Sequence, residues 1–259
     1  MNKITTGTRE LSDISLNIQK GCTNGCVYCY ACYNALRWQH IAEPEEWAEP
    51  VYYRDKINKD YRLRKGKVIM FPTTHDITPM NITKVMIVLH KVLAAGNKVL
   101  ITTKPNFQCV VTMVREFINY KDQIEFLFTI GSIHDSRIRD FESNSPDIAD
   151  RMDSLTLAFK QGYNTSVIIE PWLDTPVSLV SLIQKVQDSV NRNIWIGPCN
   201  PRYKGKDWWD ESLWGKEAIR LTDIAIQEEI SAGTITKILY KDNFVKQLDR
   251  KNKTLSQYL

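Results

Sequence analysis

Short apolar runs alternate about six times with stretches of helical periodicity, and this alternation constrains the fold of the 259-residue chain more than any other feature. The apolar runs, which we interpret as strands, span residues 14–19, 67–71, 98–102, 124–130, 166–170 and 193–197. The segments that we interpret as helices span residues 30–38, 79–95, 107–120, 147–161 and 176–190. Such an alternation is typical of a parallel sheet with crossover helices, and the short apolar strands predict burial on both faces.

A cysteine-rich loop follows the first predicted strand. Residues 21–33 read GCTNGCVYCYACY, so Cys22, Cys26 and Cys29 stand at C-x3-C-x2-C spacing. Three thiolates on one short loop suit an iron–sulfur cluster, and on a four-iron cluster they leave one iron open. Glycine tolerates backbone conformations that other residues resist, so Gly21 and Gly25 allow the loop to curve around a bulky inorganic group.

Two other interpretations of these cysteines are open. Zinc accepts four thiolates, and Cys32 completes a set of four within eleven residues, although structural zinc sites usually pair two motifs across a longer loop. Bacterial ferredoxins use the different spacing C-x2-C-x2-C-x3-C-P, and here Tyr33 rather than proline follows Cys32. A structural zinc-binding protein and a non-catalytic iron–sulfur electron carrier are therefore the alternatives. We expect Cys32 to belong to the first helix and Cys109 to pack inside a later one.

Composition and charge are those of an ordinary globular protein. Hydrophobic residues make up 43% of the chain and charged residues 25%. The net charge of +4 is too small to predict nucleic-acid binding by itself. No run approaches eighteen apolar residues, and the first residues lack a signal-peptide core, so we expect no membrane association and a cytoplasmic location. In that compartment the six cysteines are expected to be metal ligands or buried thiols.

Polar side chains follow most of the predicted strands, and ligands gather at the carboxyl ends of parallel strands in α/β folds. The candidates are Thr73, Thr74, His75 and Asp76 after the second strand, Thr103 and Lys104 after the third, Ser132 and His134 after the fourth, Glu170 after the fifth and Cys199 after the sixth. His75 and His134 are either acid–base groups or hydrogen-bonded polar residues at strand ends. Cys199 is either chemically active or an inert buried thiol.

The cysteine motif after a first strand, with the aromatic Tyr28 before the last cysteine, resembles the radical S-adenosylmethionine (SAM) superfamily. The resemblance implies a partial (β/α)6 barrel of the TIM type over residues 1–200, with residues 201–259 as a C-terminal helical or lid extension. It implies a [4Fe–4S] cluster on Cys22, Cys26 and Cys29, with SAM on the open iron and Tyr28 near the adenine. It also implies an electron donor of the flavodoxin or ferredoxin type and reductive cleavage of SAM to a 5′-deoxyadenosyl radical.

Within this superfamily the strand-end residues are similar to those of the spore photoproduct lyase-like branch. The similar segments are Thr73-Thr74-x-Asp76, Thr103-Lys104, Gly131-Ser132-Ile133 and Arg151 in the following helix. By this resemblance Ser132 contacts the ribose or carboxylate of SAM, Arg151 contacts the carboxylate, and Thr103 and Lys104 are further SAM contacts. Thr73, Thr74 and Asp76 stand where many members have a Gly-Gly-Glu-like segment that holds the amino group. The alternative for Arg151 is a surface ion pair with Asp147 or Asp150.

The substrate is not specified by these motifs. A nucleic-acid base or lesion and a small molecule or peptide are both compatible with the resemblance, and Cys199 is placed to donate a hydrogen atom to a product radical. Residues 201–214 read PRYKGKDWWDESLW, where tryptophans stand among charged residues. These tryptophans either stack on bases, with a positive surface across Lys204, Lys206 and Trp208, or form a lid over the barrel mouth. We favour the lid, because acidic residues offset the basic ones in this segment.

Overall fold

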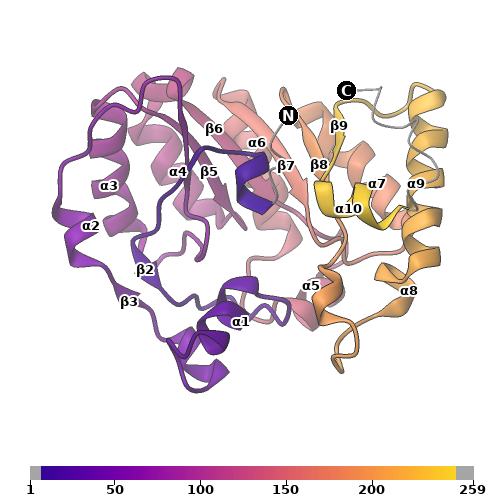
Figure 1. The fold of residues 1–259 in the computed structure, drawn as a ribbon. Coiled ribbons are helices and arrows are strands. Elements are labelled where there is room, and N and C mark those ends of the chain that lie inside the picture. Colours follow the sequence, from indigo (N-terminus) through magenta and orange to yellow (C-terminus); the bar gives the residue numbers. More distant parts are fainter. Residues whose placement is uncertain (1–6, 249–259) are drawn as a thin grey trace.

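The structure, a computed structural model, describes residues 7–248, and its largest element is a parallel seven-stranded sheet (Figure 1). The strands of this sheet, in spatial order, are β1 (Ile14–Ser15), β4 (Val68–Phe71), β5 (Lys98–Thr103), β6 (Ile124–Thr129), β7 (Asn164–Ile169), β8 (Ile194–Ile196) and β9 (Ile238–Tyr240). The strands β2 (Gln19–Lys20) and β3 (Val51–Tyr52) form a separate antiparallel pair. Neighbouring strands of the large sheet follow one another in the chain, as repeated strand–helix units require.

The helices of the described residues are α1 (Tyr30–Arg37), α2 (Arg54–Asn58), α3 (Ile82–Ala94), α4 (Phe107–Glu116), α5 (Asp135–Phe141), α6 (Ile148–Lys160), α7 (Pro176–Val186), α8 (Glu211–Trp214), α9 (Lys216–Ser231) and α10 (Asp242–Gln247). Five of the helices, α1, α3, α4, α6 and α7, lie where the sequence predicts helices. Short 3-10 turns are η1 (Gly7–Glu10), η2 (Pro44–Ala48), η3 (Ile118–Gln123), η4 (Gln187–Ser189) and η5 (Pro201–Tyr203). The predicted alternation is therefore confirmed, and α5 is an addition that the sequence interpretation missed.

Local capping explains where several of these helices begin. The Asn106 side chain accepts the Cys109 N–H at 3.2 Å, and the Asp147 side chain accepts the Asp150 N–H at 2.8 Å. Thr175 caps α7 ahead of Pro176, whose fixed φ suits the first helical position. The caps satisfy N–H groups that have no partner within the helix, so they define the loops that precede each helix.

The predicted first strand is shorter than expected, because residues 17 and 18 bond to the loop after β4 through side chains instead of continuing a strand ladder. The Asn17 Oδ1 atom accepts the backbone N–H groups of Thr73 at 2.7 Å and Thr74 at 2.9 Å. The Ile18 N–H donates to the His75 Nε2 atom at 3.2 Å instead of to a strand. The chain therefore leaves the large sheet after Ser15, and residues 19–20 pair with β3.

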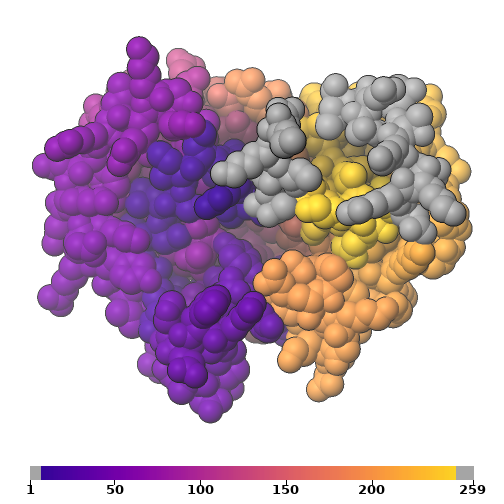
Figure 2. All heavy atoms as spheres, viewed as in Figure 1, coloured from indigo at the N-terminus to yellow at the C-terminus, as the bar shows by residue number. Residues whose placement is uncertain are grey.

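The C-terminal part of the chain is fastened to the sheet by two indoles. The Trp172 Nε1–H donates to the Leu213 carbonyl at 3.0 Å, and the Trp214 Nε1–H donates to the Trp172 carbonyl at 2.7 Å. Both rings are fully buried. Figure 2 shows this orange part of the chain beside the purple segment that contains α1, in agreement with the ring contact between Tyr33 and Tyr203 at 5.6 Å. Residues 201–248 also supply β9, while residues 249–259 of the predicted extension lie outside the described range, and its boundary stays a prediction.

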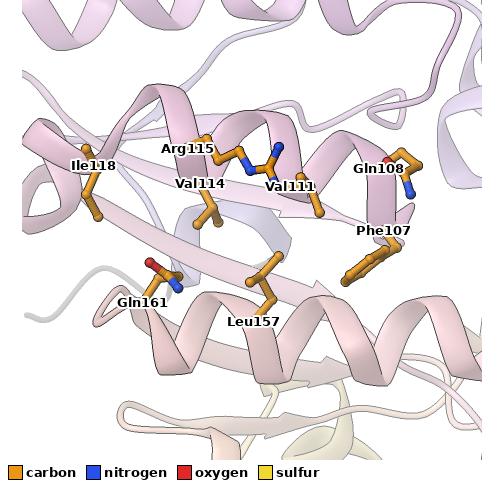
Figure 3. A pocket seen from close by; sticks show the side chains of 8 residues that line it. All are labelled: Phe107, Gln108, Val111, Val114, Arg115, Ile118, Leu157 and Gln161. Carbon is orange, nitrogen blue, oxygen red and sulfur yellow. The ribbon is translucent and has the colours of Figure 1, made fainter.

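An apolar groove lies on the helical side of the sheet, between α4 and α6 (Figure 3). Its volume is 630 Å³, and Phe107, Val111, Val114 and Leu157 contribute much of its lining. None of the residues predicted to bind a cofactor lines this groove. The groove is therefore separate from the candidate site described below.

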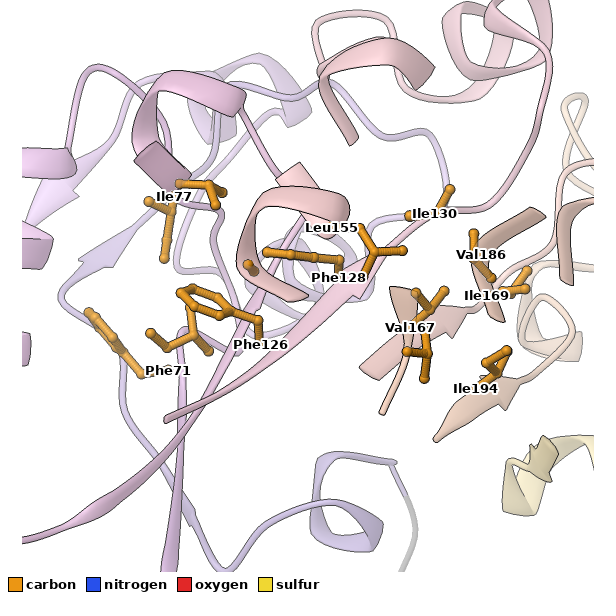
Figure 4. Close-up of a cluster of buried hydrophobic side chains, with 14 of the residues drawn as sticks. Phe71, Ile77, Phe126, Phe128, Ile130, Leu155, Val167, Ile169, Val186 and Ile194 are labelled. Atoms are coloured by element: carbon orange, nitrogen blue, oxygen red, sulfur yellow. The ribbon is translucent and has the colours of Figure 1, made fainter. Parts of the chain in front are cut away.

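Two apolar layers cover the two faces of the sheet. Alternate strand residues, such as Phe126, Phe128, Val167 and Ile169, pack in the main core with the helices (Figure 4). The residues between them form a second cluster of Met70, Leu100, Leu127 and Ile168 on the opposite face. Both faces are buried, as the unbroken apolar strands predict.

No helix in residues 7–248 is long and apolar enough to cross a bilayer.

The paired indoles make a stability prediction. Replacing Trp214 with phenylalanine leaves the Trp172 carbonyl buried without its donor, so we expect the free energy of unfolding to fall by about 1–3 kcal/mol. Urea denaturation measures the change. The matched control is Trp38→Phe, because 63% of Trp38 is exposed, and that variant should stay within about 0.5 kcal/mol of the parent. Equal values for the two variants would show that the indole bond does not fasten this segment.

Candidate functional site

The cysteine loop between β2 and α1 takes a turn that only glycine allows at two positions. Gly21 has a φ of 93° and Gly25 a φ of 64°, both in the left-handed region. A Cβ atom on Gly21 would lie 2.8 Å from the Trp47 carbonyl oxygen, and one on Gly25 would overlap Ser143. The curvature expected from the sequence is therefore present.

Three free thiols share this loop. The Cys22 N–H donates to the Trp47 carbonyl at 2.7 Å, which holds the start of the loop against η2. Cys29 caps α1, and its sulfur accepts the Cys32 N–H at 3.4 Å. Cys22, Cys26 and Cys29 form no disulfide and interact electrostatically with one another. Cys32 lies in α1, as predicted.

The environment of the loop keeps two of these thiols protonated. Burial raises the pKa of Cys22 to about 11 and raises that of Cys26 further, while the nearby Lys104 ammonium opposes both shifts. Metal binding to such thiols would release their protons. Within residues 7–248, no three Cys, His, Asp or Glu side chains are grouped so that they could hold one metal ion.

A buried ion pair lies directly beside the loop. The Arg151 Nη2 atom is 2.5 Å from the Glu142 Oε2 atom, and both side chains are essentially inaccessible to solvent. Arg151 also donates to Ser145 Oγ at 2.6 Å, to the Pro146 carbonyl at 2.9 Å and to the Thr129 carbonyl at 3.3 Å. The alternative prediction, a surface pair with Asp147 or Asp150, is wrong, because the arginine points inward from α6 to the end of α5.

Glu142 joins this pair to the loop. Tyr28 donates its hydroxyl hydrogen to Glu142, and the backbone of Glu142 bridges that of Cys26. Burial alone would raise the pKa of Glu142, but the Arg151 and Lys104 cations, with hydrogen bonds from Tyr28 and Arg151, lower it to about 2. The carboxylate is therefore ionised at every physiological pH.

Lys104 is a second cation at this site. Its Nζ atom lies 5.7 Å from the centre of the Tyr28 ring. Burial would lower the pKa of Lys104, but Cys26, Glu142 and Asp76 raise it above the ordinary value. The side chain thus stays cationic next to the thiols.

Asp76 connects the loop to two strand ends. It accepts a hydrogen bond from Asn24 Nδ2 at 2.8 Å and from the Lys104 N–H at 3.0 Å, and Thr103 donates its hydroxyl hydrogen to it. Burial raises the pKa of Asp76, although Lys104 and these hydrogen bonds oppose the shift. Asp76, Thr103 and Lys104 are therefore brought together around the cysteine loop, while the SAM contacts assigned to them stay predictions.

Thr73 and Thr74 lie at the same end of the sheet. Besides the backbone contacts to Asn17, the Thr73 hydroxyl accepts from Asn17 Nδ2 at 2.7 Å. Tyr30 at the start of α1 donates its hydroxyl hydrogen to the Thr73 carbonyl. Both threonines are half-buried, and their side chains remain candidates for ligand contact.

Ser132 is fully buried and already hydrogen-bonded. Its hydroxyl donates to Asp174 Oδ1 at 2.9 Å and accepts the His134 N–H at 2.8 Å. Asp174 also accepts the Ile133 N–H at 3.0 Å. The role of Ser132 toward SAM stays a prediction, and its observed contacts shape the loop that precedes α5.

The two histidines differ. His75 is buried, and its Nδ1 atom lies 3.0 Å from the Asp76 carbonyl, so Nδ1 carries the hydrogen and Nε2 accepts from Ile18. Burial lowers the pKa of His75 to about 4. His134 is exposed at the N-cap of α5. His75 was predicted to be either an acid–base group or a hydrogen-bonded polar residue at a strand end, and its contacts fit the second.

Cys199 follows β8 and is buried. Only 2% of it is exposed, and burial raises the pKa of its thiol to about 12. It interacts electrostatically with Glu170 and Tyr203, and Tyr203 interacts in turn with Cys29. Cys199 thus lies on the same side of the molecule as the cysteine loop.

The tryptophans of residues 201–214 pack against one another. The ring centres of Tyr203 and Trp208 are 5.3 Å apart, those of Trp208 and Trp214 are 6.4 Å apart, and those of Trp209 and Trp214 are 5.5 Å apart. Lys204 pairs with Glu211 at 2.9 Å. These ring contacts favour the predicted lid rather than a surface on which bases stack.

Three site residues were missed by the sequence interpretation. Glu142 ends a helix that was not predicted, Asn17 lay within the first predicted strand, and Asn24 looked like an ordinary loop residue. Asn24 offered the one usable signal, its position inside the cysteine motif. The Glu142 partners Tyr28 and Arg151 lie 114 and 9 residues away in the chain, so no local pattern identifies them.

Comparison of the amino-acid sequence finds a viral relative. No family model matches the chain. The uncharacterized protein ORF301 of Acidianus two-tailed virus is 24% identical over 252 residues, which cover 90% of this chain and 81% of the viral protein.

Solved structures match at lower identity. A spore photoproduct lyase variant has a TM-score of 0.54 at 11% identity, covering 93% of this chain and 79% of the lyase. Another variant, with bound AdoMet and dinucleoside spore photoproduct, has a TM-score of 0.52 at 12% identity and covers 88% of this chain. SuiB of Streptococcus suis bound to S-adenosylmethionine has a TM-score of 0.52 at 10% identity and covers 86% of this chain. The chain spans less than two thirds of the latter two proteins, 65% and 45%. The shared partial TIM barrel confirms the predicted fold class.

The buried ion pair makes a sharp prediction. Arg151→Met leaves Glu142 charged and unpaired in the interior, so the free energy of unfolding should fall by about 3–5 kcal/mol. Chemical denaturation measures it. Arg220→Met is the control, because Arg220 pairs with Glu217 on the surface, and there we expect less than about 1 kcal/mol. A loss below 1 kcal/mol in Arg151→Met would contradict the assignment of this pair as a structural anchor.

The buried His75 predicts a pH dependence. Its pKa is about 4 when folded and about 6.5 when unfolded, so the unfolded chain binds the proton more tightly. Its contribution is complete above pH 6.5 and is lost as the pH falls toward 4, by up to about 3 kcal/mol. Denaturation at pH 7 and pH 5 should show a smaller loss in His75→Gln than in the parent. The exposed His40→Gln should behave as the parent does, and an unchanged loss in His75→Gln would disprove the mechanism.

Proposed function

We propose that this chain, which has the fold of the radical SAM enzymes, binds a [4Fe–4S] cluster through Cys22, Cys26 and Cys29 and uses SAM at the open iron. When bound, the cluster supplies the electron that cleaves SAM to methionine and a 5′-deoxyadenosyl radical, which takes a hydrogen atom from the substrate. The observation that carries the proposal is the loop of three free, mutually interacting thiols on a radical SAM fold.

The residues present fit such a cluster. Each thiolate of a four-iron cluster binds a different iron, so the three sulfurs need not converge on one point as they must for a single zinc ion. Gly21 and Gly25 give the loop its curvature. Lys104 places a positive charge beside Cys26, and the α1 N-terminus presents the Cys32 N–H to Cys29. Both features favour ligands that carry negative charge.

Around this loop the chain presents groups able to bind SAM. We propose that Tyr28 lies beside the adenine and that Thr73, Thr74, Asp76, Thr103 and Lys104 line the space next to the loop. Arg151 and Ser132 are proposed contacts for the carboxylate and ribose. Arg151 is already paired with Glu142, so to bind SAM its guanidinium would have to bond both groups at once. A guanidinium has five N–H donors, which allows this.

Cys199 is the proposed hydrogen-atom donor to a product radical. A donor of a hydrogen atom must keep its S–H bond, and burial raises the pKa of this thiol to about 12. Tyr203 interacts electrostatically with both Cys199 and Cys29, which supports a position of Cys199 between the cysteine loop and the substrate.

The reaction class proposed is hydrogen abstraction from an unidentified substrate in the cytoplasm. A nucleic-acid base or lesion is one candidate, supported by the similarity to a lyase that binds a dinucleoside spore photoproduct. The cluster would need an external electron donor of the flavodoxin or ferredoxin type. The alternatives are a non-catalytic iron–sulfur carrier and a structural zinc protein.

Anaerobic reconstitution with iron and sulfide tests the proposal. With dithionite and SAM we expect 5′-deoxyadenosine, measured by liquid chromatography, and none from Cys26→Ala, which lacks one of the three ligands. Cys109→Ala is the matched control, because Cys109 is buried within α4, and it should retain both cluster and product. A cluster without SAM cleavage would favour the electron carrier. Tight zinc binding with no cluster would overturn the proposal.

A further inference from the structure

A second group of buried charges lies at the junction of the two ends of the described chain. Lys241, which is almost fully buried, is 2.7 Å from Glu10 Oε2 and 3.9 Å from Glu170 Oε2. Figure 1 shows η1, which contains Glu10, beside α10. Two carboxylates thus share one ammonium, and the closer partner is Glu10. Glu170 is left with an incompletely compensated charge, and burial raises its pKa.

Asn243 adds an unused acceptor beside Glu170. Its Nδ2 atom donates to Glu170 Oε1 at 3.0 Å and to the Pro198 carbonyl at 2.9 Å. Its Oδ1 atom is buried and has no hydrogen-bond partner within residues 7–248. A Cβ atom on Gly197 would lie 3.0 Å from both Asn243 Oδ1 and Glu170 Cδ, so these two groups pack closely against the same glycine.

This cluster faces the proposed reaction site. Glu170 follows β7 and interacts electrostatically with Cys199 and with Tyr30 at the start of α1. Its side chain is 28% exposed, unlike that of Lys241. Tyr203, which also interacts electrostatically with Cys199, has a hydroxyl that is buried without a partner among the described residues. The unmet hydrogen-bonding capacity therefore gathers around Cys199.

We propose that Glu170 and Asn243 bind a positively charged nitrogen group of the substrate, an ammonium or guanidinium, and place the adjoining carbon atoms beside Cys199. The Glu170 carboxylate and Asn243 Oδ1 are acceptors, whereas an ammonium offers three donors and a guanidinium five, with no acceptor of their own. Leaving a buried acceptor without a donor is unfavourable, and a cation satisfies both the acceptors and the excess negative charge. The inference names a substrate class for the site of the proposed function and rests on it for the chemistry, although binding requires no radical step.

The test uses agmatine as the probe, because it carries an ammonium and a guanidinium, and 1,4-butanediol as its neutral counterpart. Titration calorimetry on the anaerobically reconstituted protein should show one saturable agmatine site and no butanediol binding. Glu170→Gln removes the charge and should weaken agmatine binding about tenfold or more. Glu125→Gln is the matched control, because Glu125 is a strand carboxylate of β6 that bonds Ser166, and it should bind as the parent does.

Gly197→Ala tests the same site without changing its charge. Its methyl group would occupy the position 3.0 Å from both groups, so agmatine binding should also fall. This variant decides the question if Glu170→Gln does not fold, as judged by thermal unfolding. No agmatine binding, or equal binding by the parent and both variants, would overturn the inference.

SAM itself carries an ammonium group, so SAM affinity is measured in the same variants. Unchanged SAM affinity in Glu170→Gln, together with lost agmatine binding, assigns the carboxylate to the substrate. A parallel loss of SAM affinity would assign it to the cofactor and overturn the inference. Agmatine binding is also measured with Cys26→Ala, which lacks one cluster ligand. If this variant binds agmatine as the parent does, the inference about Glu170 stands, even if the parent forms no 5′-deoxyadenosine and the proposed function fails.

Discussion

The buried contact between Glu142 and Arg151 is the interaction on which the cysteine loop depends. An ion pair without solvent is stable only when its remaining donors and acceptors are also satisfied. Here the guanidinium donates to two further carbonyls and a hydroxyl, and the carboxylate accepts from Tyr28 and Ser145. Because Tyr28 stands between Cys26 and Cys29, these bonds hold the loop against the ends of α5 and α6.

Charge is distributed differently in the two halves of the interior. Around the cysteine loop, the cations Lys104 and Arg151 face the carboxylates Glu142 and Asp76, so charges balance before any ligand binds. Thiolates would add negative charge there, and the Lys104 ammonium, which interacts with Cys22 and Cys26, would partly offset it. Near β7 and β9, two carboxylates share Lys241, and the imbalance remains. The first half therefore suits the anionic cluster proposed above, and the second suits the proposed cation.

The surroundings of Glu170 and Cys199 depend on β9, the last strand of the large sheet. Lys241 and Asn243 follow β9, which pairs with β8 and brings the C-terminal part of the chain to the edge of the sheet. The paired indoles Trp172 and Trp214 fasten the cover formed by residues 201–214 to the loop after β7. Residues of the predicted extension therefore contribute directly to the surroundings of Glu170 and Cys199.

The alternation of strands and helices, the cysteine spacing and the need for Gly21 and Gly25 could be predicted from the amino-acid sequence, because periodicity, spacing and backbone freedom are local properties. The sequence also identified Asp76, Thr103 and Lys104 as neighbours, since the carboxyl ends of parallel strands meet at one edge. Three features could be seen only in the folded chain: Arg151 turns inward to Glu142, the first strand ends at Ser15, and Glu170 shares Lys241 with Glu10. Glu10 and Lys241 stand at opposite ends of the chain, and a contact between such residues follows from packing of the whole sheet, which no local pattern records.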